Sequence, residues 1–413
     1  MLPYKSLTDP FEADAYIKRW ESLERKVATK GFTWASIYEN YDDHQYMSDS
    51  LLVVPKSLVR ELENASRAVH DIFQKTYEQI GKDRSLIHRT GIPISLWDLF
   101  HKQGKTAFSY FTRYDFIASA NGLKVIEANT DTPVGLVEAA VAQEVICEEH
   151  RSPNPNGRLS SNIKNAWNQI IRDYNIASTD TLYFTCADWH EEDRQTVQYL
   201  MSFYPQQAAY IPLEQIVVEQ EDVRTPHGER IDFLYRLYPL EYLPNEESVT
   251  GEKIGEQLLV HIINGKVKVI NPPSALLMQS KAILALITEK KEEWYTRGEQ
   301  AVIEKYFLPT YETAHGLESY VKKPVLGREG GGIQIVSAGQ VLDEDVEYYQ
   351  DQRVVFQDYF PMPSQTIDTW DGPYTGKLLI GSHVINGEPS GLFFRVGELI
   401  TGNLSMFVAY TSG

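Results

Sequence analysis

Cysteine is scarce in this chain of 413 residues. Only Cys147 and Cys186 are present, and they form no CxxC motif, so a disulfide framework and a multi-cysteine zinc site are excluded. No run of eighteen apolar residues occurs, which excludes a conventional transmembrane helix, and the first residues lack the basic and apolar segments of a signal peptide. We therefore expect a cytoplasmic protein with no membrane partner.

Basic residues are in the minority. The chain has 39 Lys and Arg against 57 Asp and Glu, a net charge of −18, which argues against a nucleic-acid partner because phosphate backbones require basic surfaces. The same charge would suit a cationic substrate, although an acidic surface can serve solubility alone. Apolar residues make up 42% and aromatic residues 12%, enough for a sizeable core in two or three domains.

A hairpin is predicted between residues 110 and 129. Residues 110–117 and 123–128 are rich in aromatic and β-branched side chains with polar residues between them, and Asn121-Gly122 is a turn signal. Side chains alternate faces along a strand, so Arg113 shares a face with Asp115, and Glu127 shares one with Asn129.

The length of the loop decides whether these two polar pairs share a face. A two-residue Asn-Gly loop would put them on opposite faces, whereas a three-residue loop over 120–122 would set Asp115 opposite Glu127 and Arg113 opposite Asn129. Two carboxylates about 5 Å apart repel unless a cation lies between them. We therefore predict the odd-length loop and a Mg²⁺ site with hard oxygen ligands Asp115, Glu127 and Asn129. The alternative is an ordinary solvated polar face.

Two further turns could bind ligands. The segment Asn129 to Thr132 joins the hairpin to a predicted helix at 136–148, so its backbone amides could bind an anion, although Thr132 could be only the helix N-cap. A buried strand at 181–186 ends in an acidic turn containing Glu191 and Glu192, followed by a predicted helix at 195–204. This is the usual place for a ligand in α/β proteins, but also an ordinary acidic helix start. Other predicted helices cover 14–31, 58–80 and 163–174, and a further strand covers 231–237.

A glycine-rich loop follows in the C-terminal part. Residues 319–326 and 333–336 are predicted strands, and the loop between them contains Glu329, Gly330 and Gly331. Such a loop lets backbone N–H groups approach a polyphosphate and can act as a lid. It is not a Walker motif, because GxxxxGK[ST] is missing and no helix follows.

The segments Arg113-Tyr-Asp115, Glu127-Ala-Asn129 and Asn129-Thr-Asp-Thr-Pro133, which runs into Leu136-Val-Glu-Ala-Ala140, resemble the synthetase domain of glutathionylspermidine synthase. The resemblance covers nearly the whole chain, with later motifs in the same order. That family is similar in fold to the ATP-grasp ligases. The resemblance therefore implies an α/β, ATP-grasp-like fold with mixed or antiparallel sheets and flanking helices. It implies a helical scaffold over residues 1–105, a metal-hairpin and substrate part over 106–260 and a nucleotide-binding part over 261–413, as one intertwined module.

The resemblance also implies roles for single residues. It implies binding of ATP and Mg²⁺, with Thr132 contacting a peptide substrate and Glu191 or Glu192 holding the free amine of that acid. Arg113 and Arg395 would be catalytic. Arg395 follows an apolar strand, so we expect it to be partly buried and to need an anionic partner. The nucleotide-binding set would be Lys281, Lys323, Glu329, Gly330, Gly331, Gln357, Asp358, Tyr359 and Phe360. From the residues alone, Lys281 could also be a solvated side chain in the first turn of a helix.

Some positions depart from the family's pattern. Thr130 stands where the family has Ala, Ala409-Tyr410 where it has Pro-His, and Gly330-Gly331-Gly332 where it has Gly-Ala-Asn. These departures leave the ATP and metal set intact.

The predicted function is that of an ATP- and Mg²⁺-dependent ligase that joins a carboxylate to an amine through an acyl phosphate and releases ADP. The resemblance implies a peptide such as glutathione as the acid and a polyamine or other amine as the acceptor. Two alternatives are a catalytically silent ATP-binding scaffold or regulator and a kinase-like phosphotransferase. The sequence predicts no oligomeric state.

Overall fold

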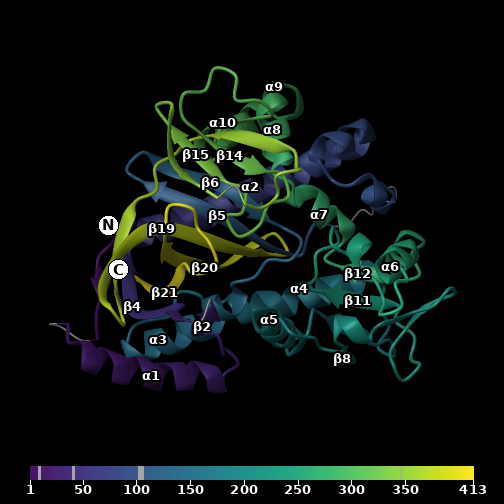
Figure 1. Cartoon of the computed structure of the whole chain (residues 1–413), viewed down its shortest axis with the longest axis horizontal. Helices are drawn as coiled ribbons and strands as arrows, with labels where there is room; N and C mark the ends of the chain where they lie inside the picture. Colours follow the sequence, from purple (N-terminus) through teal and green to yellow (C-terminus); the bar gives the residue numbers. More distant parts are fainter. Residues whose placement is uncertain (8–10, 40–41, 101–106, 346) are drawn as a thin grey trace.

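The computed structural model describes residues 1–7, 11–39, 42–100, 107–345 and 347–413. These residues form one eight-stranded, one five-stranded and one four-stranded sheet, together with two two-stranded ribbons, and helices lie around the sheets (Figure 1). The predicted α/β class, with mixed and antiparallel sheets and flanking helices, is confirmed.

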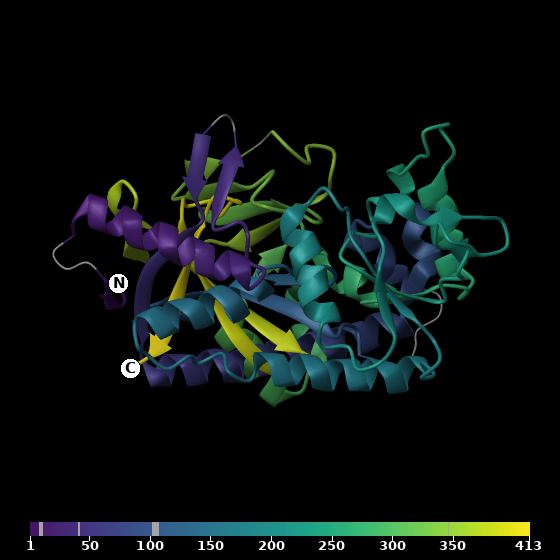
Figure 2. The ribbon, with the colours of Figure 1, turned by 90° about the horizontal axis from the view of Figure 1, so that it is seen from below.

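The eight-stranded sheet joins segments from both ends of the chain. Its order is β1-β4-β21-β20-β19-β5-β6, with β18 added to β19, and every pairing is antiparallel except that of β4 with β21. Because β1 and β21 both pair with β4, the two termini lie at the same edge of the molecule in both views (Figures 1 and 2). The strands are β1 Tyr4–Lys5, β4 Met47–Val54, β5 Phe111–Ser119, β6 Gly122–Asn129, β18 Ser364–Thr369, β19 Gly372–Ile385, β20 Glu388–Gly397 and β21 Met406–Ser412.

Both faces of this sheet are covered. Helix α2 (Lys56–Lys82) repeats apolar residues every three or four positions, begins directly after Pro55 and packs in one core with Phe394. The neighbouring Phe393 points to the opposite face, as strand alternation requires, and packs in a second core with α1 (Ala13–Thr29) and with residues of the predicted 136–148 helix. That predicted helix includes a π-helical turn, η3 (Glu138–Ala142), before α3 (Gln143–Glu149).

The five-stranded sheet carries the glycine-rich loop. It is antiparallel throughout, in the order β13-β17-β14-β15-β16, and helices α8 to α10 lie near it (Figure 1). Its strands are β13 Thr310–Tyr311, β14 Tyr320–Pro324, β15 Gln334–Ser337, β16 Gln340–Glu344 and β17 Val354–Asp358. The helices are α8 Ala282–Glu289, α9 Lys291–Trp294 and α10 Arg297–Tyr306.

The four-stranded sheet is parallel, in the order β12-β11-β7-β8. Trp167 packs between it and the large sheet, with ring centroids 5.3 Å from Phe184 and 5.1 Å from Phe111. The elements of this part are α4 Leu159–Tyr174, β7 Leu182–Thr185, α5 Glu191–Met201, β8 Ala208–Tyr210, β11 Phe233–Arg236, α6 Ile254–Ile263 and β12 Lys268–Ile270.

Short elements connect these sheets. The two ribbons pair β2 (Ser36–Glu39) with β3 (Asp42–Gln45) and β9 (Val217–Val218) with β10 (Val223–Arg224). The remaining helical turns are η1 Arg84–Thr90, η2 Ile94–Phe100, η4 Leu213–Gln215, η5 Leu243–Asn245 and α7 Pro273–Gln279. No helix among the residues described is both long and apolar enough to cross a membrane.

One predicted boundary is wrong in a way that affects the site. Helix α5 begins at Glu191, four residues before the predicted start at 195. The neutral form of the His190 side chain can cap it by accepting a hydrogen bond at Nδ1 from the Asp193 backbone N–H, at 3.4 Å, and the acidic first turn complements the helix dipole. Glu191 and Glu192 therefore lie in the first helical turn and not in a loop before it.

Candidate active site

The β5–β6 hairpin brings the two polar pairs to one face. Arg113 pairs with Asn129 and Asp115 with Glu127, as predicted. The predicted loop is wrong, however: Ser119 pairs with Gly122, so the loop has two residues, Ala120 and Asn121. The register shifts by one between Asp115 and Phe116, where Ile126 is left over as a β-bulge. The bulge, and not the turn, places the carboxylates opposite each other.

Arg113 and Asp115 form a buried ion pair within β5. The guanidinium donates from Nε to Oδ1 at 2.8 Å and from Nη2 to Oδ2 at 3.0 Å, and its Nη1 donates to the Val134 carbonyl at 2.8 Å. The amide of Asn129 donates to Asp115 Oδ2 at 3.2 Å. Arg113 is 7% and Asp115 3% exposed, so the pair is held rigidly with little access to water.

Two lysines surround Glu127. The Lys281 ammonium lies 2.8 Å from Glu127 Oε1 and donates to the Gly327 carbonyl at 2.7 Å. Lys323 donates to the Ile126 carbonyl at 3.0 Å and to Gln357 Oε1 at 2.8 Å. Burial alone would raise the pKa of Glu127, but the charges of Lys281 and Lys323 outweigh it and lower that pKa. Burial lowers the pKa of Lys323 to about 8, although Glu127 acts in the opposite direction.

The residues predicted to bind Mg²⁺ are chemically suited to it. Asp115, Glu127 and Asn129 supply carboxylate and amide oxygens, the ligands this ion prefers. A carboxylate has about four acceptor positions, so Asp115 keeps acceptor capacity beside its bonds to Arg113 and Asn129, and Glu127 keeps Oε2. No group of three His, Cys, Asp or Glu side chains close enough for a metal occurs in the described part of the chain. The predicted site would thus depend on the Asn129 amide and on substrate oxygens.

The glycine-rich loop has the backbone geometry that its composition predicts. It connects β14 to β15, and Glu329, Gly330 and Gly332 have φ angles of 56°, 82° and 74°. A Cβ on Gly330 would lie 2.7 Å from the Ile400 side chain, so a larger residue would not fit without movement. Glu329 Oε2 accepts a hydrogen bond from the Asn403 amide at 2.7 Å, which ties the loop to the segment before β21.

Most of the predicted site residues line one cavity of about 1040 Å³ between the three large sheets. Lys281 does not line it, because it lies behind Glu127, and Gly331 faces an adjoining cavity of about 940 Å³. Those that do are Arg113, Asp115, Glu127, Asn129, Thr132, Glu191, Glu192, Lys323, Glu329, Gly330, Gln357, Asp358, Tyr359, Phe360 and Arg395.

Arg395 enters this cavity from β20. It is partly buried, as predicted, and its guanidinium lies 5.5 Å from the centroid of the Phe393 ring, which Arg113 approaches at 5.8 Å. The expected anionic partner is missing, since the Arg395 guanidinium has no hydrogen bond or ion pair to any residue that the structure describes. A partly buried guanidinium without a partner is suited to an anionic ligand.

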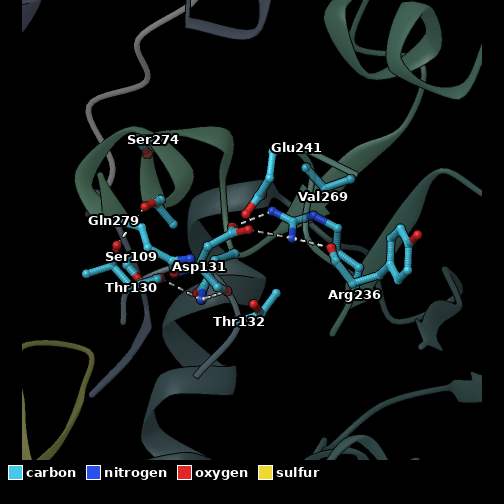
Figure 3. A network of polar contacts seen from close by, with 12 residues as sticks. Ser109, Thr130, Asp131, Thr132, Arg236, Glu241, Val269, Ser274 and Gln279 are labelled. Carbon is cyan, nitrogen blue, oxygen red and sulfur yellow. Dashed lines mark hydrogen bonds and ion pairs between the residues drawn. The ribbon is translucent and has the colours of Figure 1, made fainter. Parts of the chain in front are cut away.

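The turn after the hairpin is held by side chains that the sequence did not identify. Arg236 of β11 donates to Asp131 Oδ1 at 2.5 Å and to Oδ2 at 3.0 Å, and both side chains are almost fully buried. Figure 3 shows Glu241 beside this pair. The Asp131 backbone N–H donates to Gln279 Oε1 at 2.9 Å, so this amide is not free to bind an anion.

Arg328 connects this turn to the glycine-rich loop. It donates to Glu241 Oε1 at 2.6 Å and to Thr132 Oγ1 at 3.1 Å. Thr132 is not a helix N-cap, because the helix begins at Leu136. Arg328 thus joins the glycine-rich loop to the turn that carries Thr132, a predicted substrate contact. Arg328 stands inside the glycine motif, which could have drawn attention to it, but Arg236 carried no comparable signal.

The acidic first turn of α5 lines the far end of the cavity. Thr33 Oγ1 donates to Glu191 Oε1 at 2.7 Å, whereas Glu192 has no hydrogen bond or ion pair to any described residue. Burial, together with the nearby charges of Glu138 and Asp193, raises the pKa of Glu192 to about 8. The hydrogen bond to Asp193 raises the pKa of His190 to about 9. At this end of the cavity His190 is paired with Asp193 and Arg194 with Glu191, which leaves Glu192 without a basic partner among the described residues.

The fold and the match to a family model define the class. A structure of a glutathione synthetase-like effector from Globodera pallida covers 98% of this chain and 98% of its own length, with a TM-score of 0.56 at 11% identity, so the two share a fold. The fold is therefore ATP-grasp-like. Residues 15–411 match the family model "Glutathionylspermidine synthase preATP-grasp". The chain belongs to the glutathionylspermidine synthase family, and thus to the ligases that join an acid to an amine.

A curated relative agrees with this assignment. A Haemophilus influenzae protein named "Putative acid--amine ligase" is 27% identical over 327 residues, which is 73% of this chain and 74% of that protein.

Proposed function

We propose that this protein is an ATP- and Mg²⁺-dependent ligase that forms an amide between a carboxylate and an amine, with an acyl phosphate as intermediate. The observation that carries the proposal is the convergence of Arg113 and Arg395 on the Phe393 ring, in a cavity that the hairpin carboxylates and the glycine-rich loop also line. Binding energy and charge neutralisation are what such phosphoryl transfer requires from a protein.

Two steps make up the reaction. A carboxylate oxygen of the acid attacks the γ-phosphorus of ATP, the bond to the β-phosphate oxygen breaks, and ADP leaves. The neutral amine nitrogen then attacks the acyl carbon, inorganic phosphate leaves with the bonding electrons, and the nitrogen loses one proton. Bound Mg²⁺ supplies positive charge next to the β and γ phosphates, and Asp115, Glu127 and Asn129 would hold it.

The chain's own residues position the reactants. Arg395 has an uncompensated charge and would bind the transferring phosphoryl group and, with Arg113, the oxyanion of the tetrahedral intermediate. Lys323 and the N–H groups of the loop at Glu329 and Gly330 would bind phosphates. The predicted Gly331 N–H donates instead to the Arg328 carbonyl at 2.9 Å. Gln357, Asp358, Tyr359 and Phe360 form the end of β17 and the chain after it, beside Lys323, where the adenine would lie.

Lys281 and the substrate residues complete the assignment. Lys281 would reach a phosphate by leaving Glu127, or would act by fixing Glu127 and Gly327. Thr132 would contact the acid substrate next to the glycine-rich loop. Glu192, which has no partner of its own, is better placed than Glu191 to accept the ammonium of that acid. The family suggests glutathione as the acid and spermidine as the amine.

The decisive experiment measures ADP release with Mg·ATP, glutathione and spermidine, with each omitted in turn, and the mass of any product. We expect ADP only when both substrates are present, and a product of their summed mass less one water. ADP that forms without an amine would indicate a phosphotransferase. ATP binding without ADP over a panel of acids and amines would indicate a binding scaffold. Arg395→Ala should abolish ADP release, whereas Arg158→Ala, at an exposed position paired with Glu63, should not.

A further inference from the structure

A buried glutamate lies directly behind the acidic end of the cavity. Glu138 is the first residue of η3 and is 0% exposed. Its Oε1 accepts two hydrogen bonds, from Trp34 Nε1 at 3.1 Å and from the Tyr46 hydroxyl at 2.8 Å. Its Oε2 is buried and has no hydrogen-bond partner. Burying a carboxylate in this way is costly, so the site must have a use for its charge or its geometry.

The two donors to Glu138 are parts of the cavity wall. Trp34 and Tyr46 both line the cavity and are each only 6% exposed. Phe32 packs against both, with ring centroids 4.6 Å from Trp34 and 6.4 Å from Tyr46. One Glu138 carboxylate oxygen accepts hydrogen bonds from both the Trp34 ring N–H and the Tyr46 hydroxyl. Glu138 therefore fixes the orientation of two aromatic side chains at this end.

The charges around this end do not balance. Glu138 and the unpartnered Glu192 interact unfavourably with each other, and the Tyr46 hydroxyl lies within reach of both charges. Arg113 is neutralised by Asp115, and the charge of His190 is shared with Asp193. Among these cations only the Arg395 guanidinium, which interacts with the Tyr46 hydroxyl, has no acidic partner in the described part of the chain. A bound cation would stabilise the ionised forms of both side chains, which burial and their mutual repulsion otherwise disfavour.

We propose that Glu138 is a positioning residue whose negative charge, together with its hydrogen bonds from Tyr46 and Trp34, makes this end of the cavity specific for a substrate bearing a protonated primary amine, which Glu192 contacts. An alkylammonium offers three hydrogen-bond donors to the carboxylate and can lie against the aromatic rings. This inference rests on the proposed function. The ammonium could belong to the acid substrate, or to the acceptor at a nitrogen other than the one that attacks.

The test measures binding without turnover, by calorimetry on the full chain. Two ligand pairs are compared, glutathione with N-acetylglutathione and spermidine with triacetylspermidine. We expect the wild type to prefer the ammonium form at least tenfold in one pair, which also identifies the source of the ammonium. In Glu138→Gln, whose amide oxygen can still accept from Trp34 and Tyr46, that preference should fall about tenfold. The matched control is Glu144→Gln, six residues further on, exposed and paired with Lys30 at 3.0 Å.

A merely structural role gives a different result. If Glu138→Gln weakens the ammonium and acetylated ligands equally, or leaves the preference unchanged, the proposal is wrong. It is also wrong if the wild type shows no preference in either pair. Tyr46→Phe keeps the ring and removes the donor to Glu138, so it should reduce the same preference, and it decides the matter if Glu138→Gln does not fold. An enzyme with this preference and no ADP release would contradict the proposed function alone.

Discussion

Lys281 bridges the hairpin and the glycine-rich loop, with its ammonium 2.8 Å from Glu127 Oε1 and 2.7 Å from the Gly327 carbonyl oxygen. Lys281 is 5% exposed. The hairpin and the glycine-rich loop, two hundred residues apart in the sequence, are thereby held together beside the cavity. The contact means that the carboxylate predicted to bind Mg²⁺ is oriented by a cation before any substrate arrives.

Replacing this lysine should destabilise the fold. Lys281→Met leaves Glu127 and the Gly327 carbonyl without their cation, and breaking a buried pair from one side costs about 3 kcal/mol. Urea unfolding should show this loss, and adding Glu127→Gln should recover part of it. Lys291→Met, at a pair that is largely exposed on the Glu304 side, should cost about 0.5 kcal/mol or less. Equal losses of unfolding free energy in Lys281→Met and Lys291→Met would show that the contacts of Lys281 stabilise the fold no more than a largely exposed ion pair does.

Replacing either cavity arginine, Arg113 or Arg395, should slow ADP formation even when the new residue is lysine. Arg113 uses two parallel hydrogen bonds to Asp115 and a third to Val134, a geometry that an ammonium cannot reproduce. We expect Arg113→Lys and Arg395→Lys each to lower ADP formation about a hundredfold, the effect of losing one oxyanion donor of about 3 kcal/mol. Arg158→Lys should leave the rate unchanged. Turnover at the wild-type rate in Arg113→Lys would remove Arg113 from the mechanism.

The hairpin oxygens should set the requirement for magnesium. Glu127→Gln keeps the shape of the side chain but removes its charge, so the free Mg²⁺ concentration that gives half-maximal ADP release should rise about tenfold or more. Asp115→Asn should act in the same direction and also loosen Arg113. Glu63→Gln, at a partly buried position paired with Arg158, serves as the control. An unchanged Mg²⁺ dependence in both hairpin variants would exclude these residues as ligands.

How far the site could be predicted is clearest at this hairpin. The expectation that a cation lies between Asp115 and Glu127 was enough to predict their register. The structural feature that produces this register was predicted wrongly. A bulge at Ile126 looks like any β-branched strand residue, whereas Asn121-Gly122 is a strong turn signal that the structure does not follow.

Contacts between distant segments were beyond the sequence. Periodicity assigns a residue to a face but not to a partner, so nothing joined Asp131, Arg236, Glu241 and Arg328 before the fold was known. Glu138 falls in a correctly predicted helical segment, where an acidic residue ordinarily faces water. Its burial follows from packing α1, the large sheet and η3 together, which no local pattern encodes.

The stability of the ligand-free protein should depend on pH through Glu192. Burial and the neighbouring charges of Glu138 and Asp193 raise its pKa from the usual 4.5 to about 8. Between these values the folded state holds a proton that the unfolded chain has released, so the contribution of this group is greatest below pH 4.5 and is lost as the pH rises through 8. The slope can reach about 1.4 kcal/mol per pH unit.

The difference between the wild type and Glu192→Gln isolates this contribution, because other histidines and carboxylates titrate in both proteins. Unfolding free energies in urea, measured every half unit from pH 5 to pH 8, should show the wild type losing stability relative to Glu192→Gln as the pH rises. Glu144→Gln should show a constant difference from the wild type over the same range. A wild-type curve parallel to that of Glu192→Gln would mean that Glu192 ionises normally, and that the end of the cavity is neither as buried nor as acidic as the structure shows.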